Sequence, residues 1–317
     1  MASHAPSLAM KSFIRSRFPA LFSLLRNLNL LNQAYFSKYG RIPGAINYPL
    51  SIVLQRHEIA ARKKGAHALL MPPELAEKLQ ELRTEGFCKL NLSDVVTDVE
   101  ATNLLDSLSC AAVEFGTPTH DDLVHKLGVR KTKSYFYDIA NSNSGIKSKL
   151  EGFARSPKAI ALAAKYLGQM PLIESVSFIY SPPIEGTQLI AAQGWHLDRE
   201  QKSKLKIFLS PYEVSVASGP TTLMPLRHSL GKKYPNFPAY FDDAEAMAAG
   251  IPVDEKVQLL NDVGELYMAD TSKLFHYGAR HQTMPRFLVI ISYCPLESRL
   301  RSQLRKEVKE KSIDYRW

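Results

Sequence analysis

A chain of 317 residues that is 45% apolar and 22% charged can bury a substantial core, which excludes a globally disordered protein. The net charge of +9 resides in residues 1–70, which hold ten Lys and Arg against one acid, Glu58, and lack the interleaved stacking aromatics that nucleic-acid binding favours. Three widely spaced cysteines indicate no zinc or disulfide framework, and no uncharged apolar run reaches the ~18 residues of a membrane-spanning helix.

Residues 1–70 are expected to form a basic, helical N-terminal extension. Phe18–Leu31 is apolar on one broad face, and a second helix is expected over about Leu50–Ala66. Three interpretations of the first helix stay open: its Leu face packs on the domain behind it, residues 11–36 make a peripheral membrane contact, or the segment is an organelle transit peptide in a eukaryotic source. Because Arg26 interrupts the apolar stretch and no small-residue cleavage pattern follows, no secretory signal is evident and a cytoplasmic location is expected.

Residues 71–317 are expected to form one domain, entered through Met71-Pro72-Pro73. Its first part is mostly helical, with a loop over Asn141–Gly145 and a short aromatic strand over Ser134–Asp138. Helices are expected over Pro73–Thr84, Asp98–Phe115 and Pro157–Leu167, and a charged C-terminal helix over Glu297–Glu310.

After residue 170 the pattern changes to short strands separated by turns. They are expected over Ile173–Tyr180, Thr187–Gln193, Leu205–Leu209, Pro220–Met224, Val257–Leu260, Glu265–Met268 and Arg286–Tyr293. Many short antiparallel strands after a group of helices predict an α+β fold. Its core is expected to be a double-stranded β-helix, of the jelly-roll or cupin-like kind, padded by helices.

The stretch Gln193–Asp198 carries the main chemical signal. On a strand, alternate side chains share a face, so His196 and Asp198 would point into one cavity. With a second His from elsewhere they would form the facial triad of non-haem Fe(II) oxygenases. A second His-x-Asp, His120 to Asp122, opens a helical pattern, and residues two apart on a helix do not face each other.

Further segments accompany this pair in a fixed order. The strand pattern Leu205–Leu209 is followed by Ser218–Ser229, which contains Gly-Pro and later Pro-Leu-Arg-His-Ser. His276 comes near the end, and Arg286 lies ten residues after it. Over about Leu75–Pro295, this order resembles the phytanoyl-CoA dioxygenase family of Fe(II)/2-oxoglutarate oxygenases.

The resemblance implies roles for individual residues. His196, Asp198 and His276 would bind Fe(II), with His281 as a competing distal ligand that fits the family spacing less well. Arg286 would hold the distal carboxylate of 2-oxoglutarate, a task for which a planar guanidinium is suited. Arg280 is a weaker candidate for that role. Ser177 would line the co-substrate pocket by analogy.

The resemblance also implies the reaction. Dioxygen and 2-oxoglutarate would be consumed, with succinate and CO₂ released, while a C–H bond of a small organic substrate is attacked. Because related halogenases replace the carboxylate ligand by a small residue, Asp198 favours hydroxylation or desaturation. Two alternatives stay open: a non-catalytic jelly-roll binding module, and a non-redox metal enzyme on the same fold, which would not need Arg286.

Overall fold

The computed structural model describes residues 44–127, 136–183, 189, 191–198, 203–229, 240–280 and 282–297. The chain divides into two compact units, one of residues 55–299 and one of residues 1–54 with 300–317. The helix expected over Phe18–Leu31, the membrane contact through residues 11–36 and nearly all of the charged C-terminal helix lie outside the described residues. The domain boundary at residue 70 and the cytoplasmic location stay predictions. None of the described helices is both long and apolar enough to cross a bilayer.

A large antiparallel sheet forms the centre of the unit of residues 55–299. In the described part of the chain its strand order is β1 (Phe87–Asn91), β7 (Glu265–Asp270), β4 (Leu205–Leu209), β9 (Arg286–Cys294), β3 (Leu172–Ser181) and β2 (Tyr137–Asp138). Alternate side chains of these strands enter two different apolar clusters. In β4, Leu205, Ile207 and Leu209 belong to the cluster that the helices cover, whereas Phe208 belongs to the cluster on the opposite face.

A smaller antiparallel sheet lies against that opposite face. Its described strands are, in order, β6 (Val257–Gln258), β5 (Thr222–Leu223) and β8 (His276–Tyr277). Phe208 and Leu288 of the large sheet share an apolar cluster with Leu223 of β5 and Leu274, which precedes β8. Two antiparallel sheets with an apolar layer between them form the predicted double-stranded β-helix, so the α+β fold class is confirmed.

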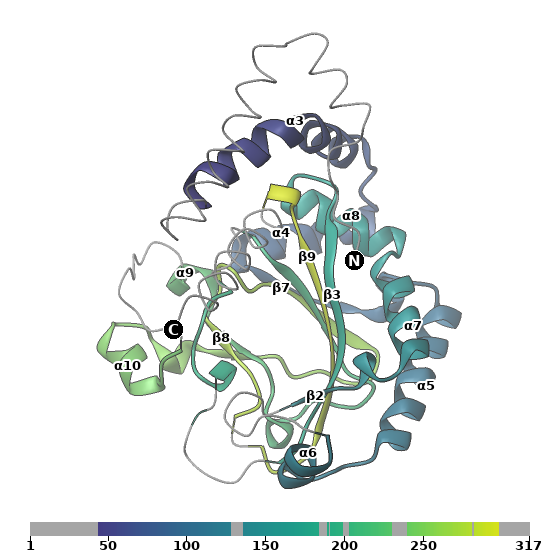
Figure 1. Ribbon diagram of the computed structural model, residues 1–317, viewed down its shortest axis with the longest axis vertical. Helices are drawn as coiled ribbons and strands as arrows, with labels where there is room; N and C mark the ends of the chain where they lie inside the picture. Colours follow the sequence, from purple (N-terminus) through teal and green to yellow (C-terminus); the bar gives the residue numbers. More distant parts are fainter. Residues whose placement is uncertain are drawn as a thin grey trace, which may run out of the picture. The chain divides into compact units, whose positions relative to one another are not determined.

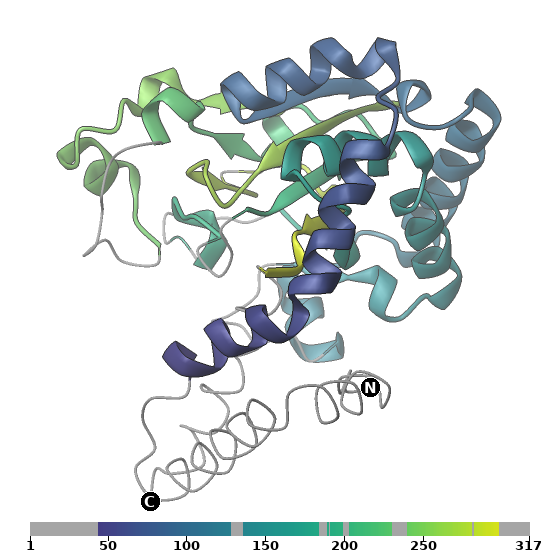
Figure 2. The same ribbon diagram turned by 90° about the horizontal axis from the view of Figure 1, so that it is seen from above.

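Helices cover the outer face of the large sheet, as Figure 1 shows for α5, α7 and α8, with β8 and α10 on the other side. Figure 2 shows the same separation from above, with the teal helices at one end and the green α9 and α10 at the other. Within the described residues the α-helices are α3 (Gly44–Ala68), α4 (Ala76–Glu85), α5 (Asp98–Phe115), α6 (His120–Leu127), α7 (Ser144–Ala154), α8 (Pro157–Leu167), α9 (Leu226–Ser229) and α10 (Asp243–Ala248). Short 3₁₀ turns are η1 (Pro73–Leu75), η2 (Leu92–Asp94), η3 (Ile139–Asn141), η4 (Ala191–Gln193), η5 (Val216–Ser218) and η6 (Val253–Glu255).

Local sequence signals set several helix ends. The side chain of Thr97 accepts a hydrogen bond from the amide of Glu100, whose carboxylate binds the Thr97 amide in return, and this capping box starts α5. Proline at the first position of α8 and the left-handed Gly168 after its last residue bound that helix. Both helices, and strand β4, have the predicted bounds.

One local prediction was wrong, and a second was wrong where it can be tested. The strand expected over Thr187–Gln193 lies partly outside the described residues, and its last three residues form the 3₁₀ turn η4, where Ala191 has a φ of 48°. The expected loop over Asn141–Gly145 contains the start of α7, because the Asn143 side chain accepts a hydrogen bond of 3.0 Å from the Ile146 amide and caps the helix. The helix expected at His120 is confirmed as α6, and Asp122 binds the Thr119 hydroxyl at its N-terminus.

Gly86 is expected to be intolerant of a side chain. Its φ is +83°, and a Cβ there would lie 2.7 Å from Cδ2 of the buried Leu274. Gly86→Ala should lower the free energy of unfolding by about 2–4 kcal/mol, which combines left-handed strain with overpacking. Urea unfolding measures this loss.

Gly264→Ala is the matched control, because Gly264 has a φ of +89° but nothing lies within 4 Å of its added Cβ. That variant should lose only the strain component, about 1–2 kcal/mol. Equal losses in the two variants would contradict the steric explanation.

Candidate metal centre

Two histidines from distant parts of the chain face each other through a backbone bridge. The amide of His196 donates to the carbonyl of His276 at 3.0 Å, and the amide of His276 donates to the carbonyl of His196 at 3.0 Å. The bridge brings the two imidazole rings to a centroid distance of 4.1 Å. The preceding residue, Trp195, forms a second backbone bridge, with Phe241. Trp195 and His196 are therefore both held by backbone hydrogen bonds to other parts of the chain.

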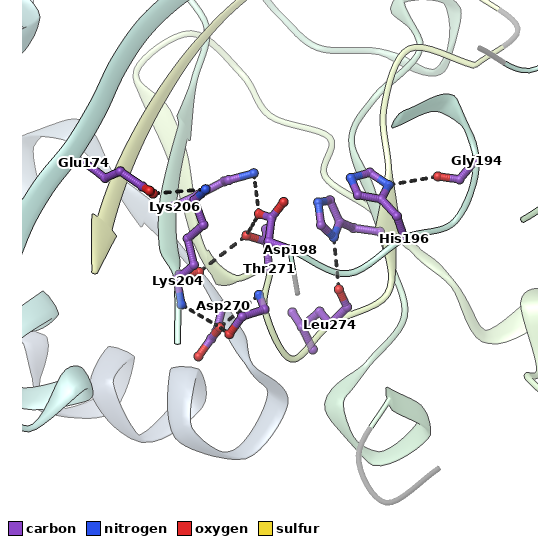
Figure 3. A network of polar contacts seen from close by, with 11 residues as sticks. Glu174, Gly194, His196, Asp198, Lys204, Lys206, Asp270, Thr271 and Leu274 are labelled. Carbon is purple, nitrogen blue, oxygen red and sulfur yellow. Dashed lines mark hydrogen bonds and ion pairs between the residues drawn. The ribbon is translucent and has the colours of Figure 1, made fainter. Parts of the chain in front are cut away.

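Asp198 completes a group of three side chains. Its amide donates to the carbonyl of Thr271 at 3.0 Å, which fixes the backbone two residues after His196. One ligand atom from each of His196, Asp198 and His276 lies within 4.8 Å of the others. Figure 3 shows His196 and Asp198 of this group. Among the residues that the structure describes, this is the one group of three or more His, Cys, Asp or Glu that could hold a metal ion.

In each imidazole Nδ1 contacts a backbone carbonyl, and Nε2 remains as the ring nitrogen that could bind a metal ion. Nδ1 of His196 contacts the carbonyl of Gly194 at 2.9 Å, and Nδ1 of His276 contacts the carbonyl of Leu274 at 3.0 Å. A carbonyl can only accept, so Nδ1 carries the proton and Nε2 keeps a lone pair for a cation. Burial lowers the pKa of both imidazoles, and for His276 the neighbouring His196 lowers it further. The rings are therefore neutral at pH 7.

The carboxylate of Asp198 is largely withdrawn from solvent, with its side chain 19% exposed, but remains charged. Burial alone would raise its pKa, but the ammonium groups of Lys206 and, to a smaller extent, Lys204 hold the pKa well below its usual range. Lys206 Nζ lies 2.6 Å from Asp198 Oδ2, and the Thr271 hydroxyl donates to the same oxygen at 2.5 Å. An ionised carboxylate therefore stands beside two neutral imidazoles.

This donor set fits a divalent transition metal. Two imidazole nitrogens and one carboxylate oxygen are the ligands of the facial triad, in which the remaining positions around Fe(II) stay open. The backbone carbonyls that bind each Nδ1 match the outer interactions that orient metal-binding imidazoles elsewhere. The expected convergence of His196 and Asp198 with His276 is present in the structure, while their role as ligands stays a prediction.

Arg286 opens β9 and is 3% exposed. Its Nη1 donates to the carbonyl of Gly219 at 2.6 Å, and its Nη2 lies 3.4 Å from the position of a Cβ on Gly278. The guanidinium therefore reaches the loop that follows β8, two residues beyond His276. Ser177 lies on β3 opposite Ile290, between Val176 and Phe178, which belong to the helix-covered cluster. Its side chain consequently faces the smaller sheet.

Arg280, the weaker candidate for the anchor of 2-oxoglutarate, contacts an aromatic ring, a carboxylate and a backbone carbonyl. Its guanidinium carbon lies 3.6 Å from the centroid of the Tyr277 ring, and Nη1 binds Asp243 at 2.7 Å. Nε donates to the carbonyl of Gln193, just before the His196 segment. Arg280 thus supports the backbone beside the site. His281 lies outside the described residues.

Lys206 and Thr271 were not among the predicted site residues. A signal for Lys206 was present, because it is the charged residue inside the apolar strand Leu205–Leu209. Nothing in the sequence singled out Thr271. It follows the last residue of β7, and only the tertiary fold brings its hydroxyl to Asp198.

No family model matches this chain. No curated protein matches it either. Among solved structures, it is similar to the epimerase SnoN in complex with Fe³⁺, alpha ketoglutarate and nogalamycin RO, with 15% identity and a TM-score of 0.48 over 70% of this chain and 84% of that one. It is also similar to EctD from S. alaskensis with bound Fe, with 17% identity and a TM-score of 0.46 over 69% and 75% of the two chains.

The carbocyclase SnoK from nogalamycin biosynthesis shows a similar likeness, with 15% identity and a TM-score of 0.45 over 72% of this chain and 85% of that one. Likenesses at this level decide neither activity nor substrate. The resemblance to the phytanoyl-CoA dioxygenase family stays a prediction from the sequence.

The pair of Arg280 and Asp243 yields a stability prediction. Asp243→Ala should lower the free energy of unfolding by about 1–3 kcal/mol, because it leaves a buried guanidinium without its counter-charge, while the partial exposure of Asp243 limits the loss. Urea unfolding of Asp243→Ala, Arg280→Met and the double variant gives the coupling energy, which should be at least about 1 kcal/mol.

Asp254→Ala serves as the control, since Asp254 is exposed, and should change stability by less than about 0.5 kcal/mol. A coupling energy near zero would show that the two residues do not stabilise each other.

Proposed function

We propose that this chain is an Fe(II)- and 2-oxoglutarate-dependent dioxygenase, similar to the phytanoyl-CoA dioxygenase family, that hydroxylates or desaturates a small organic substrate. The observation that carries the proposal is the convergence of His196, Asp198 and His276, with both Nδ1 atoms bound to backbone carbonyls. When bound, Fe(II) with 2-oxoglutarate supplies the activation of dioxygen for attack on a C–H bond. His196, His276 and Asp198 would hold this metal through two Nε2 atoms and one carboxylate oxygen.

Arg286 would bind the distal carboxylate of 2-oxoglutarate. Its guanidinium is buried beside Gly278, two residues after His276, and a buried cation favours an anionic ligand. The inward face of β3, where Ser177 lies, would contribute a hydroxyl to the same pocket. A non-redox metal enzyme would need the three ligands without this cation, so Arg286 favours the oxygenase.

The test is an anaerobic titration with Fe(II) and then 2-oxoglutarate, monitored by the weak visible metal-to-ligand charge-transfer band. The wild-type protein should develop the band, and His276→Ala should not, because one ligand is removed. Arg286→Met should weaken 2-oxoglutarate binding by about 10- to 100-fold, the value of a charge-assisted hydrogen-bonded pair.

His228→Ala and Arg227→Met are matched controls, because both side chains pair with the exposed Glu255. Both should keep the band and the affinity of the wild type. Circular dichroism and urea midpoints verify that each variant is folded. No band in folded, metal-loaded wild-type protein would reject the oxygenase in favour of a binding module or a non-redox enzyme.

A further inference from the structure

Both described partners of the Asp198 carboxylate bind the same oxygen. Lys206 Nζ lies 2.6 Å from Oδ2, and Thr271 Oγ1 lies 2.5 Å from Oδ2 (Figure 3). Two donors on one carboxylate oxygen leave the other oxygen, Oδ1, for a different partner. A ligand for a metal has to come from that oxygen unless Oδ2 gives up its bonds.

Packing of the apolar core does not require a lysine at the position of Lys206. Its neighbours Leu205 and Ile207 are fully buried in the helix-covered cluster, so Lys206 points toward the smaller sheet. Its side chain is only 15% exposed, and a charge removed from water needs a counter-charge. The carboxylate of Asp198 supplies it. An apolar residue would fit this strand without that requirement, which indicates that the ammonium group serves the site.

Two backbone hydrogen bonds hold Thr271 in place. Its amide donates to the carbonyl of Lys204 at 3.0 Å, and its carbonyl accepts from the Asp198 amide at 3.0 Å. The residue before it, Asp270, is fully buried and accepts hydrogen bonds from several groups. These are the hydroxyls of Tyr166, Ser203 and Ser272, together with the ammonium group of Lys273. The Thr271 hydroxyl is therefore a fixed donor that does not depend on a flexible side chain.

We propose that Lys206 and Thr271 are positioning residues that retain Oδ2 of Asp198 and leave Oδ1 as the single carboxylate oxygen for the metal. The inference rests on the proposed function. A carboxylate that binds through one oxygen leaves one more coordination position open than a carboxylate that binds through two. A co-substrate that binds the metal through two atoms needs that position, and dioxygen needs a further one. The contacts of Lys206 and Thr271 with Oδ2, here called the clamp, therefore keep a coordination position open for 2-oxoglutarate.

A competing role for Lys206 is direct contact with a carboxylate of the co-substrate. Thr271 separates the two roles, because Thr271→Val removes a donor to Oδ2 without changing charge and nearly without changing shape. If the clamp matters, loss of either donor frees Oδ2 to bind the metal. If Lys206 instead contacts the co-substrate, only Lys206→Met affects its binding.

The experiment compares Thr271→Val and Lys206→Met with two controls in Co(II)-loaded protein. Lys204→Met is the matched charge control, because Lys204 lies on the same segment but its ammonium group pairs with Glu174 at 3.0 Å. Thr271→Ser is the rescue variant, because it restores the hydroxyl. The visible d–d spectrum of Co(II) is recorded before 2-oxoglutarate is added, and the affinity for 2-oxoglutarate is then measured by titration. Urea midpoints show whether each variant is folded.

Both Thr271→Val and Lys206→Met should weaken the d–d absorption, since cobalt with more ligands absorbs less, and should weaken 2-oxoglutarate binding by about tenfold or more. Lys204→Met and Thr271→Ser should retain the wild-type spectrum and affinity. A wild-type spectrum and affinity in Thr271→Val, with loss of 2-oxoglutarate binding in Lys206→Met alone, would overturn the clamp in favour of direct contact.

Weaker Co(II) binding in both variants, with an unchanged spectrum and unchanged affinity for 2-oxoglutarate at saturating metal, would reduce the two residues to a structural role and also overturn the proposal. Failure of the proposed function gives a different result. In that case the wild-type protein itself would not bind 2-oxoglutarate, whether or not it binds Co(II).

Discussion

The backbone bridge between His196 and His276 is the interaction on which the rest of the site depends. Its two reciprocal hydrogen bonds of 3.0 Å join a segment that follows η4 to a strand of the smaller sheet. The two histidines are far apart in the sequence, so only the tertiary fold can bring them together. Once the bridge forms, the position of Asp198 follows, because only one residue separates it from His196 and its amide binds the carbonyl of Thr271. A single antiparallel contact therefore assembles donors from two distant parts of the chain.

Alternation along the large sheet lets the same strands serve the core and the site. In β4 the side chains of Leu205, Ile207 and Leu209 pack under the helices, and those of Lys206 and Phe208 face the smaller sheet. The helix-covered face is almost wholly apolar and supplies stability through burial. That stability allows the inward face to carry Lys206 and Arg286, whose burial is unfavourable without partners. The position of each charge is thus fixed by strands that apolar residues hold from behind.

The sequence predicts the elements whose signals are local. Pro157 and Gly168 bound α8, and short, mostly apolar runs mark β4 and β9, so these elements lie where they were expected. The start of α7 was missed because Asn143 and Ser144 favour turns and helix caps equally, and only the packing of Ile146 and Leu150 decides between them. The end of the strand expected before Trp195 was wrong because the chain turns there at Ala191. The contacts of Asp198 with Lys206 and Thr271 depend on tertiary structure, which no local pattern encodes.

The electrostatics of the site explain how a metal could bind without a change in protonation. Burial lowers the pKa of both imidazoles, and the ammonium group of Lys206 helps to keep Asp198 ionised despite burial that would raise its pKa. At neutral pH the donors are therefore two neutral rings and one carboxylate, the forms that ligate a cation. A lone buried carboxylate would instead tend to take up a proton. Lys206 thus preserves the charge that attracts a metal, while it adds a positive charge that favours an anionic ligand beside that metal.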